Sequence, residues 1–277
     1  MAISVVINTY NSARLLPKVL ETVRDFDEIV VCDMESIDDT VEIAKKYGAK
    51  VVTFPKENHN HCDPARNFAI SHASNEWVFV VDSDELVSED LRRFLYKFLQ
   101  KAEKDKSLKG LYIPRKNYII DHFRISKYPD YKLRFFAKDK AYWPPEIHSV
   151  PEIDGNVSKI PANKRNLALV HIPRSLTQVV NRMNRVTTIE MLERRGSKVN
   201  AFQVVMRPAS EFISTYFFKG ACRNGLTGFI NSVNVAVTEF YRLAKIYEDC
   251  RVHELTGVRL HDDASAAEII ENLSKLE

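Results

Sequence analysis

The fold of this chain is decided by the stretch Glu76-Trp-Val-Phe-Val-Val-Asp-Ser-Asp-Glu85. Residues 77–81 form an unbroken apolar run, which is typical of a strand buried on both faces of a sheet. Three carboxylates then follow within four residues, those of Asp82, Asp84 and Glu85. Such charges repel one another unless a divalent cation binds them. The stretch therefore predicts a metal–diphosphate site, and the alternative is an acidic turn that caps the following helix.

Alternating strands and helices surround this stretch. Buried strands are predicted over residues 3–7, 28–32 and 50–54, and helices over residues 12–24, 36–47, 64–73 and 89–104. This order predicts an α/β fold with a mostly parallel, Rossmann-like sheet and helices on both faces. Ligands bind such sheets beyond the carboxyl ends of the strands. We therefore expect three polar stretches to converge in space: residues 8–11, residue 33 and residues 82–85.

The chain changes character after Gly110. Strands are predicted over residues 111–114 and 132–137, and an irregular, proline-rich segment over residues 139–173. Helices are predicted over residues 175–195, 200–219 and 224–247, followed by a polar tail that ends in a helix beginning near Asp263. We therefore expect three parts: a sheet domain over residues 1–173, a helical region over residues 174–248 and a tail over residues 249–277.

The composition is that of an ordinary globular protein, with 277 residues and a formal net charge of +3. Basic side chains gather in residues 164–198, but we expect no nucleic-acid partner. The four cysteines show neither zinc nor disulfide spacing, which favours a reduced, cytosolic setting. We expect the N-terminus to form a first strand rather than a signal peptide. The longest uncharged stretch, residues 224–238, is too short and too polar to span a bilayer.

Polar residues at the strand ends are candidates for a nucleotide pocket. The carboxylate of Asp33 can accept hydrogen bonds from a nucleobase or a ribose, and its alternative role is a cap for the next helix. Asn8, Tyr10 and Asn11 are candidates for the same pocket, and the alternative is an ordinary polar turn. Arg66 lies in the first turns of a predicted helix, where it either reaches a carboxylate or phosphate or is a surface arginine.

Further candidates lie in the second half of the predicted sheet domain. His148 can ligate a metal or transfer a proton, and Glu146 and Glu152 lie near it in the sequence. The alternative is a structural histidine. Arg134 alternates with apolar residues in a predicted strand. It points to an acceptor or a phosphate, or it lies on the solvent face of the strand.

These motifs together resemble glycosyltransferase family 2, the inverting, sugar-nucleotide-dependent enzymes with the GT-A fold. Within that family the chain is similar to the branch of bacterial lipopolysaccharide-core β-glucosyltransferases. The resemblance covers about residues 1–247 and is carried by Ser4-Val-Val-Ile-Asn-Thr-Tyr-Asn11, Asp27-Glu-Ile-Val-Val-Cys-Asp33, Ala65-Arg-Asn-Phe-Ala69, Trp77 through Asp82-Ser-Asp-Glu85, Tyr128-Pro-Asp-Tyr-Lys-Leu-Arg-Phe-Phe136, and residues 36–44, 47–51, 113–117, 207–208, 217–220 and 225–229.

The resemblance implies a role for individual residues. Asp33 would bind the nucleobase, Asp82 the ribose, and Asp84 a divalent cation, Mn²⁺ or Mg²⁺, that bridges the diphosphate. The implied reaction is a single displacement that moves a hexose, with glucose favoured, from a UDP-sugar to a saccharide acceptor in lipopolysaccharide or other surface-glycan assembly. A carboxylate would deprotonate the acceptor hydroxyl, while the cation and positive groups stabilise the departing diphosphate.

The chain departs from the family pattern at the catalytic base. The branch usually has His-Glu where this sequence has His148-Ser149. Glu146, Glu152 or His148 itself is then the predicted base, and Asp130 is a weaker candidate. His148 is also a predicted metal ligand beside Asp84.

Two other functions stay open. One is a catalytically degenerate protein that binds a nucleotide sugar or a lipid, for which the missing glutamate at Ser149 is the motive. The other is a sugar-nucleotide nucleotidyltransferase, which usually carries a glycine-rich phosphate loop after its first strand. Residues 8–11 hold no glycine, which disfavours this alternative.

The helical half combines aromatic and basic side chains. Met206, Phe212, Tyr216, Phe217 and Phe218 lie among Arg207, Lys219 and Arg223. A helix of this kind can lie on an anionic membrane surface, which would suit a lipid-linked acceptor. The alternative is a helix packed on the catalytic domain or in a homodimer interface. We expect a cytoplasmic location, with peripheral association at the inner face of the cytoplasmic membrane as an open alternative.

Overall fold

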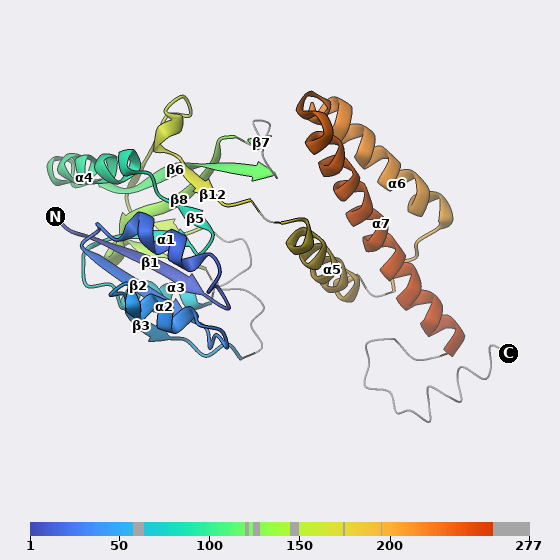
Figure 1. The fold of residues 1–277 in the computed structure, drawn as a ribbon, viewed down its shortest axis with the longest axis horizontal. Helices are drawn as coiled ribbons and strands as arrows, with labels where there is room; N and C mark the ends of the chain where they lie inside the picture. The colour runs from blue at the N-terminus through green and yellow to red at the C-terminus, as the bar shows by residue number, and fades with distance from the viewer. Residues whose placement is uncertain are drawn as a thin grey trace. The chain divides into compact units, whose positions relative to one another are not determined.

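The computed structural model describes residues 1–57, 64–119, 122–123, 128–144, 150–173, 175–194 and 196–256. The chain divides into two compact units (Figure 1). The first comprises Met1–Tyr118 and Phe123–Ile172, and the second comprises Ile119–His122 and the chain from Pro173 onward. The assignment of the helical region to an acceptor, a membrane or a partner subunit stays a prediction.

The first unit is built on one large mixed sheet. Its strands run in the order β3-β2-β1-β4-β8-β6-β12-β5, with β11 beside β6. Their bounds are β1 (Ile3–Thr9), β2 (Glu28–Asp33), β3 (Lys50–Thr53), β4 (Trp77–Asp82), β5 (Glu85–Leu86), β6 (Leu108–Ile119), β7 (His122–Phe123), β8 (Asp130–Ala137), β11 (Asn156–Lys159) and β12 (Leu169–His171). β9 (Ala141–Tyr142) and β10 (Glu152–Ile153) form a separate antiparallel pair.

The parallel half of the sheet aligns the strand ends that the sequence predicts to converge. β1 lies between β2 and β4 and is parallel to both. Asn8 is paired in register with Cys32 on one side and Asp82 on the other, and Thr9 is paired with Asp33. The predicted α/β fold with a mostly parallel sheet is confirmed, and its polar strand ends meet at one edge.

The second half of the sheet is more regular than predicted. β8 is antiparallel to both β4 and β6, and β12 is parallel to β6 and antiparallel to β5. The irregular segment predicted over residues 139–173 therefore contains strands. These strands have two to four residues each, too few to produce a hydrophobic alternation that the sequence would reveal.

Helices cover both faces of the sheet, as predicted (Figure 1). They are α1 (Leu16–Val23), α2 (Thr40–Lys46), α3 (Ala65–Ser71) and α4 (Glu89–Lys104), with 3-10 turns η2 (Lys138–Lys140) and η3 (Arg165–Leu167). On β1, the side chains of Ile3, Val5 and Ile7 join the core cluster that contains α1 and α4. Val6 points the other way, into the cluster that contains α3. Each such buried side chain contributes about 1.5–3 kcal/mol to folding.

The helix after the carboxylates is not capped by them. Ser88 is the N-cap of α4, and its hydroxyl accepts a hydrogen bond from the Leu91 amide at 3.2 Å. The backbone of Asp82 instead donates to the Glu85 carboxylate at 3.1 Å. The alternative of an acidic capping turn is therefore wrong, because a serine already satisfies the helix start.

The second unit is helical. Its described elements are α5 (Leu176–Glu193), α6 (Ala201–Ile213), a π turn η4 (Ser214–Phe218), a 3-10 turn η5 (Ala221–Asn224) and α7 (Gly225–Thr256). Capping boxes open α5 at Ser175 and α6 at Asn200. α7 runs eight residues beyond the expected start of the polar tail, and its buried Asp249 lies in that extension. Of the helices that the structure describes, none is long and apolar enough to cross a membrane.

Candidate functional site

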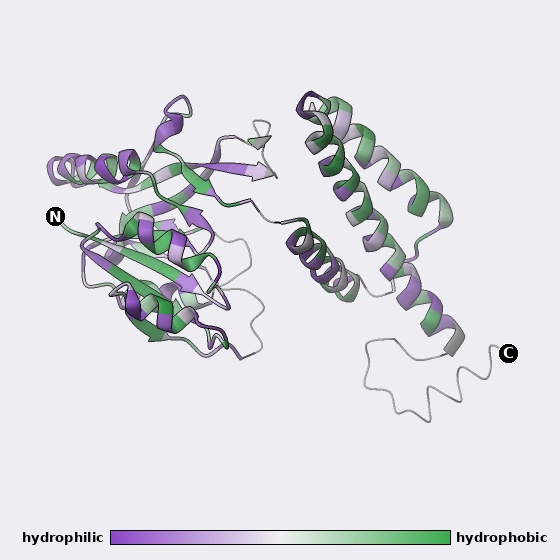
Figure 2. Ribbon diagram, in the orientation of Figure 1, coloured by the Kyte–Doolittle hydropathy of each residue, from purple (hydrophilic) through white to green (hydrophobic). Residues whose placement is uncertain are grey.

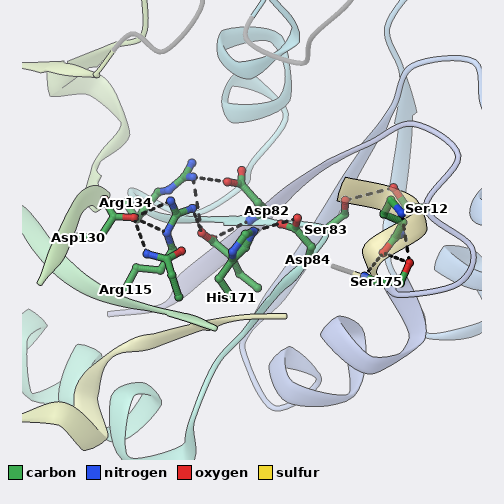
Figure 3. Close-up of polar contacts among 12 residues, drawn as sticks. Ser12, Asp82, Ser83, Asp84, Arg115, Asp130, Arg134, His171 and Ser175 are labelled. Atoms are coloured by element: carbon green, nitrogen blue, oxygen red, sulfur yellow. Dashed lines mark hydrogen bonds and ion pairs between the residues drawn. The ribbon is translucent and has the colours of Figure 1, made fainter. Parts of the chain in front are cut away.

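Two arginines hold Asp82 at the end of β4. The Arg66 Nη2 lies 3.2 Å from the Asp82 Oδ1. The Arg134 Nη2 pairs with the Asp82 Oδ2, and Figure 3 shows these two residues. Burial raises the pKa of Asp82, but the charges of Arg134 and Arg66 outweigh this effect and hold that pKa well below its usual range. Asp82 is therefore an ionised carboxylate whose position is fixed from both sides.

A second ion-pair chain continues from this carboxylate. Glu85 is fully buried, and its Oε1 lies 2.9 Å from the Arg115 Nη1. The Arg115 Nη2 lies 2.7 Å from the Asp130 Oδ2, which also accepts a hydrogen bond from the Asn117 amide at 3.0 Å. Burial raises the pKa of Asp130, but these donors lower it to about 2. A carboxylate with so low a pKa is a weak base, which disfavours Asp130 as the catalytic base.

These pairs change the argument for a cation. We expected three carboxylates that repel one another, and this expectation is wrong for Asp82 and Glu85, because arginines neutralise both. The arginines themselves also correct two alternatives. Arg66 and Arg134 are buried, so Arg66 is not a surface arginine and Arg134 does not lie on a solvent face.

Trp143 completes the arginine pair, and the sequence did not indicate it. The Arg66 guanidinium carbon lies 4.4 Å from the centre of the Trp143 ring, and that of Arg134 lies 5.5 Å away. The backbone of Trp143 is held by Asn67, whose amide Nδ2 donates to its carbonyl at 2.6 Å and whose Oδ1 accepts from its N–H at 2.9 Å. Trp143 is therefore held in place and packs against both guanidinium groups.

Asp84 meets a histidine that the sequence did not indicate either. The His171 Nε2, at the end of β12, lies 3.1 Å from the Asp84 Oδ2 (Figure 3). β12 reaches Asp84 because it pairs with β5, where His171 is opposite Glu85. The only signal in the sequence is a histidine that follows the short apolar run Leu169-Val170.

A divalent cation fits the Asp84–His171 pair on its donor chemistry. A carboxylate oxygen and an imidazole nitrogen are both ligands of first-row divalent metals. Within the described residues no group of three or more potential protein ligands gathers. Asp84 and His171 would therefore hold such a cation with oxygens from a ligand completing its coordination.

Asp33 organises the loop that follows β2. It accepts hydrogen bonds from the Thr9 hydroxyl at 2.9 Å, the Ser36 hydroxyl at 2.6 Å and the Ser36 amide at 2.8 Å. The N-cap of α2 is Asp39, so Asp33 is not a helix cap. A carboxylate accepts about four hydrogen bonds, which leaves room for one further donor.

The loop after β1 carries the other nucleotide-pocket candidates. Asn11 has a positive φ of 48°. Its backbone N–H donates to the Ser36 hydroxyl at 2.8 Å, and its side-chain Oδ1 accepts from the backbone N–H of Ile37 at 2.9 Å. The Tyr10 ring is exposed, with the Lys56 ammonium 4.6 Å from its centre.

Asn8 is the unusual residue of this edge. It is buried, and neither atom of its side-chain amide has a hydrogen-bond partner among the described residues. The same holds for the Nε and Nη1 of Arg134 and the indole Nε1 of Trp143. Buried polar groups of native proteins are almost always paired, so these groups are available to bind water or a polar ligand beside Asp82.

The predicted base region is only partly described. Glu146 and His148 lie outside the described residues, so their catalytic and metal roles stay predictions. Glu152 is exposed in β10 and is paired in register with Tyr142 of β9. Its role as a base also stays a prediction.

The glycosyl transferase family 2 model matches residues 4–149, which is more than half of the chain. The lipopolysaccharide core biosynthesis glycosyltransferase LpsC of Rhizobium meliloti is 25% identical over 257 residues, covering 90% of this chain and 93% of that protein. An uncharacterised glycosyltransferase of Rickettsia typhi is 27% identical over 269 residues, covering 89% and 87% of the two chains.

Among solved structures, the mannosyltransferase PcManGT from Pyrobaculum calidifontis superposes with a TM-score of 0.51 at 15% identity, covering 88% of this chain and 86% of that one. This likeness concerns the fold, a GT-A sheet followed by a helical region. The family model covers β1 to β4 and the Asp82-Ser83-Asp84 strand end. The chain therefore belongs to glycosyltransferase family 2.

Proposed function

We propose that this protein is an inverting, metal-dependent hexosyltransferase that moves a sugar, glucose by preference, from a UDP-sugar to a saccharide acceptor. The acceptor would belong to lipopolysaccharide core or another surface glycan, since LpsC is described as a lipopolysaccharide core biosynthesis enzyme. A lipid-linked acceptor would bring the protein from the cytoplasm to the inner face of the cytoplasmic membrane.

One observation carries this proposal: the His171 Nε2 lies 3.1 Å from the Asp84 Oδ2, and Asp84 follows the ionised Asp82 by two residues. Mn²⁺ or Mg²⁺ held there would neutralise the charge that develops on a departing diphosphate. The mannosyltransferase PcManGT, whose fold is similar, was solved in complex with GDP-Man and Mn²⁺.

Each neighbouring residue then has a defined task. Asp82 would accept hydrogen bonds from ribose hydroxyls, because two arginines keep it ionised and in place. The fourth acceptor position of Asp33 would bind a nucleobase N–H. The buried donors of Asn8 and Arg134 would bind the oxygens of the donor substrate, which supplies the partners these groups lack among the described residues.

The acceptor hydroxyl needs a base. The hydrogen-bond donors of Asp130 hold its pKa at about 2 although burial raises it, which leaves Glu146, Glu152 and His148 as the candidates. We keep the carboxylates as the first choice, because a carboxylate matches the family's single displacement. Loss of activity on Glu152→Gln alone would select Glu152.

A thermal-shift panel tests the proposal. The wild type is scanned with UDP-glucose, other UDP-sugars and GDP-mannose, each with and without Mn²⁺, beside Asp84→Ala. A ligand that binds the native state raises Tm by mass action. We expect one UDP-sugar to raise Tm only with metal, and this rise to vanish in Asp84→Ala. Asp139→Asn, which changes an exposed carboxylate of η2, is the control and should behave as the wild type.

The outcomes separate the alternatives. A metal-dependent shift together with slow hydrolysis of the UDP-sugar supports the transferase, and the anomeric configuration of the product, measured by NMR, tests inversion. A shift without any turnover would identify the catalytically degenerate binding protein. No shift with any nucleotide sugar would contradict the proposal.

A further inference from the structure

The turn between α6 and α7 exposes large apolar side chains. Phe217 is 59% exposed, Phe218 85% and Leu226 73%. We call these three residues the hairpin tip. Side chains of this size are usually buried, and three exposed ones at one turn of the chain are of the kind that marks an interaction site.

The apolar surface continues from the hairpin tip along α6. Exposed apolar side chains follow one another at helical spacing: Phe202, Val205, Met206, Ala209 and Ile213. Phe212 of the same helix packs within the unit, where its ring lies 5.7 Å from that of Phe229 in α7. Figure 2 shows the hydrophobic colouring of α6 and of the adjoining start of α7. α6 therefore exposes apolar side chains in addition to those that it packs against α7.

The chain segment that forms the hairpin tip carries basic charges. Residues 214–229 contain Lys219 and Arg223 and no aspartate or glutamate. Both basic side chains are exposed, and the Lys219 ammonium lies 3.7 Å from the carboxylate of Glu211 in α6. An apolar patch with a basic edge matches a surface that is apolar inside and negatively charged outside.

We propose that the hairpin tip and the outer side of α6 dock on an anionic lipid bilayer. Phe217, Phe218 and Leu226 enter the boundary between headgroups and acyl chains, to a depth of about 5–10 Å. Lys219 and Arg223 contact lipid phosphates at the level of the headgroups. The proposal rests on the proposed function in one respect, that a lipid-linked acceptor lies in the same bilayer.

Co-sedimentation of the full chain with vesicles tests this docking. We use phosphatidylglycerol–phosphatidylethanolamine vesicles, with phosphatidylcholine vesicles for comparison. The wild type should bind the anionic vesicles and bind phosphatidylcholine at least tenfold more weakly. Phe217→Ser/Phe218→Ser should lower the partition coefficient at least tenfold, because it removes the two aromatic rings that enter the bilayer. Lys219→Gln and Arg223→Gln should each lower it about fivefold.

The matched control is another pair of adjacent exposed aromatic residues. Phe240 and Tyr241 in α7 are 42% and 44% exposed, about 20 Å along the helix from Leu226. Phe240→Ser/Tyr241→Ser should leave the partition coefficient unchanged. If it lowers vesicle binding as much as Phe217→Ser/Phe218→Ser does, the hairpin tip is not the docking surface.

Two further outcomes would overturn the proposal. In one, sedimentation velocity shows that the wild type is a dimer and that Phe217→Ser/Phe218→Ser is a monomer, while no variant binds vesicles. The patch is then a self-association surface. In the other, the double variant unfolds at a much lower temperature and vesicle binding is absent throughout, and the patch is then packed within the protein. Vesicle binding needs no nucleotide sugar, so its failure leaves the thermal-shift test of the proposed function independent.

Discussion

The guanidinium carbon of Arg66 lies 4.4 Å from the centre of the Trp143 ring, while its Nη2 lies 3.2 Å from Asp82. Arg134 repeats the arrangement, with its guanidinium near the same ring and on the other oxygen of the same carboxylate. The indole ring of Trp143 therefore packs against both guanidinium groups and holds them beside Asp82. An interaction between a desolvated cation and an indole contributes about 2 kcal/mol, enough to affect how firmly the carboxylate is held.

We predict that Trp143→Leu raises the KM for the UDP-sugar about tenfold, because the arginines lose their aromatic support and Asp82 its fixed position. The unfolding free energy should also fall, by about 3 kcal/mol, since a large buried ring is replaced by a smaller side chain. Trp143→Phe keeps a π face and should keep a KM within about threefold of the wild type. Equal KM values for the two variants would show that the ring acts through its volume alone.

The Asp84–His171 pair gives a second prediction, for a double-mutant cycle. Asp84→Asn and His171→Ala should each abolish the part of the thermal shift that depends on metal. The double variant should lose no more than either single variant, because both residues would hold one cation and such effects are not additive. Isothermal titration with Mn²⁺ in the presence of UDP measures this. Additive losses of affinity would show that the two residues act on different ligands.

The ion pairs of Asp130 predict how stability depends on pH. Burial raises the pKa of Asp130, but the donors Asn117 and Arg115 outweigh it and bring that pKa to about 2, below its ordinary value of 3.8. A lowered pKa in the folded state contributes stability above about pH 4, and this contribution is lost as the pH falls from about 4 to 2. Asp130→Asn should therefore cost about 1–2 kcal/mol at pH 7 and about half as much at pH 3.

Urea unfolding of wild type and Asp130→Asn at both pH values measures that difference. Asp139→Asn changes an exposed carboxylate and should show no difference at either pH. A cost for Asp130→Asn that is the same at pH 3 and pH 7 would mean that the amide disturbs packing rather than the charge.

The sequence was informative where a signal is local. The apolar run before Asp82 predicts β4, and the alternation of strands and helices predicts the order of β1 to α4. The end of each parallel strand meets its neighbours by the geometry of the sheet, so the meeting of Asp33 with the loop after β1 follows from the pattern as well.

The sequence was silent where a contact joins residues that lie far apart along the chain. Trp143 reaches Arg66 because Asn67 holds its backbone, and these residues are 76 positions apart. His171 reaches Asp84 because the three-residue strand β12 pairs with β5, across 87 positions. Neither contact leaves a periodic pattern, because Asn67 binds Trp143 through a side chain of helix α3, and β12 and β5 have only three and two residues. Arg66 was predicted to reach a carboxylate or a phosphate, but the sequence did not identify Asp82 as the partner of Arg66 and Arg134, so a cation appeared necessary for that residue.

The turn that presents the hairpin tip depends on Gly228. A Cβ at this position would lie 1.8 Å from the carbonyl oxygen and 2.7 Å from the carbonyl carbon of Ala221, both backbone atoms that cannot swing aside. In an ordinary helix Gly→Ala stabilises by about 1 kcal/mol. Here the sign should reverse, and Gly228→Ala should lower the unfolding free energy of the helical unit by at least about 2 kcal/mol, because α7 must move away from the turn.

Gly220→Ala separates this clash from backbone strain. Gly220 has the left-handed conformation, with φ 73° and ψ 21°, but nothing within 4 Å of an added Cβ, so alanine there costs only that conformation, about 1 kcal/mol. Thermal unfolding should rank the wild type above Gly220→Ala and Gly220→Ala above Gly228→Ala. Because the clash moves the start of α7, which carries Leu226, Gly228→Ala should also weaken vesicle binding more than Gly220→Ala does. A Gly228→Ala protein as stable as the wild type would show that α6 and α7 do not approach as closely in solution as Ala221 and Gly228 require.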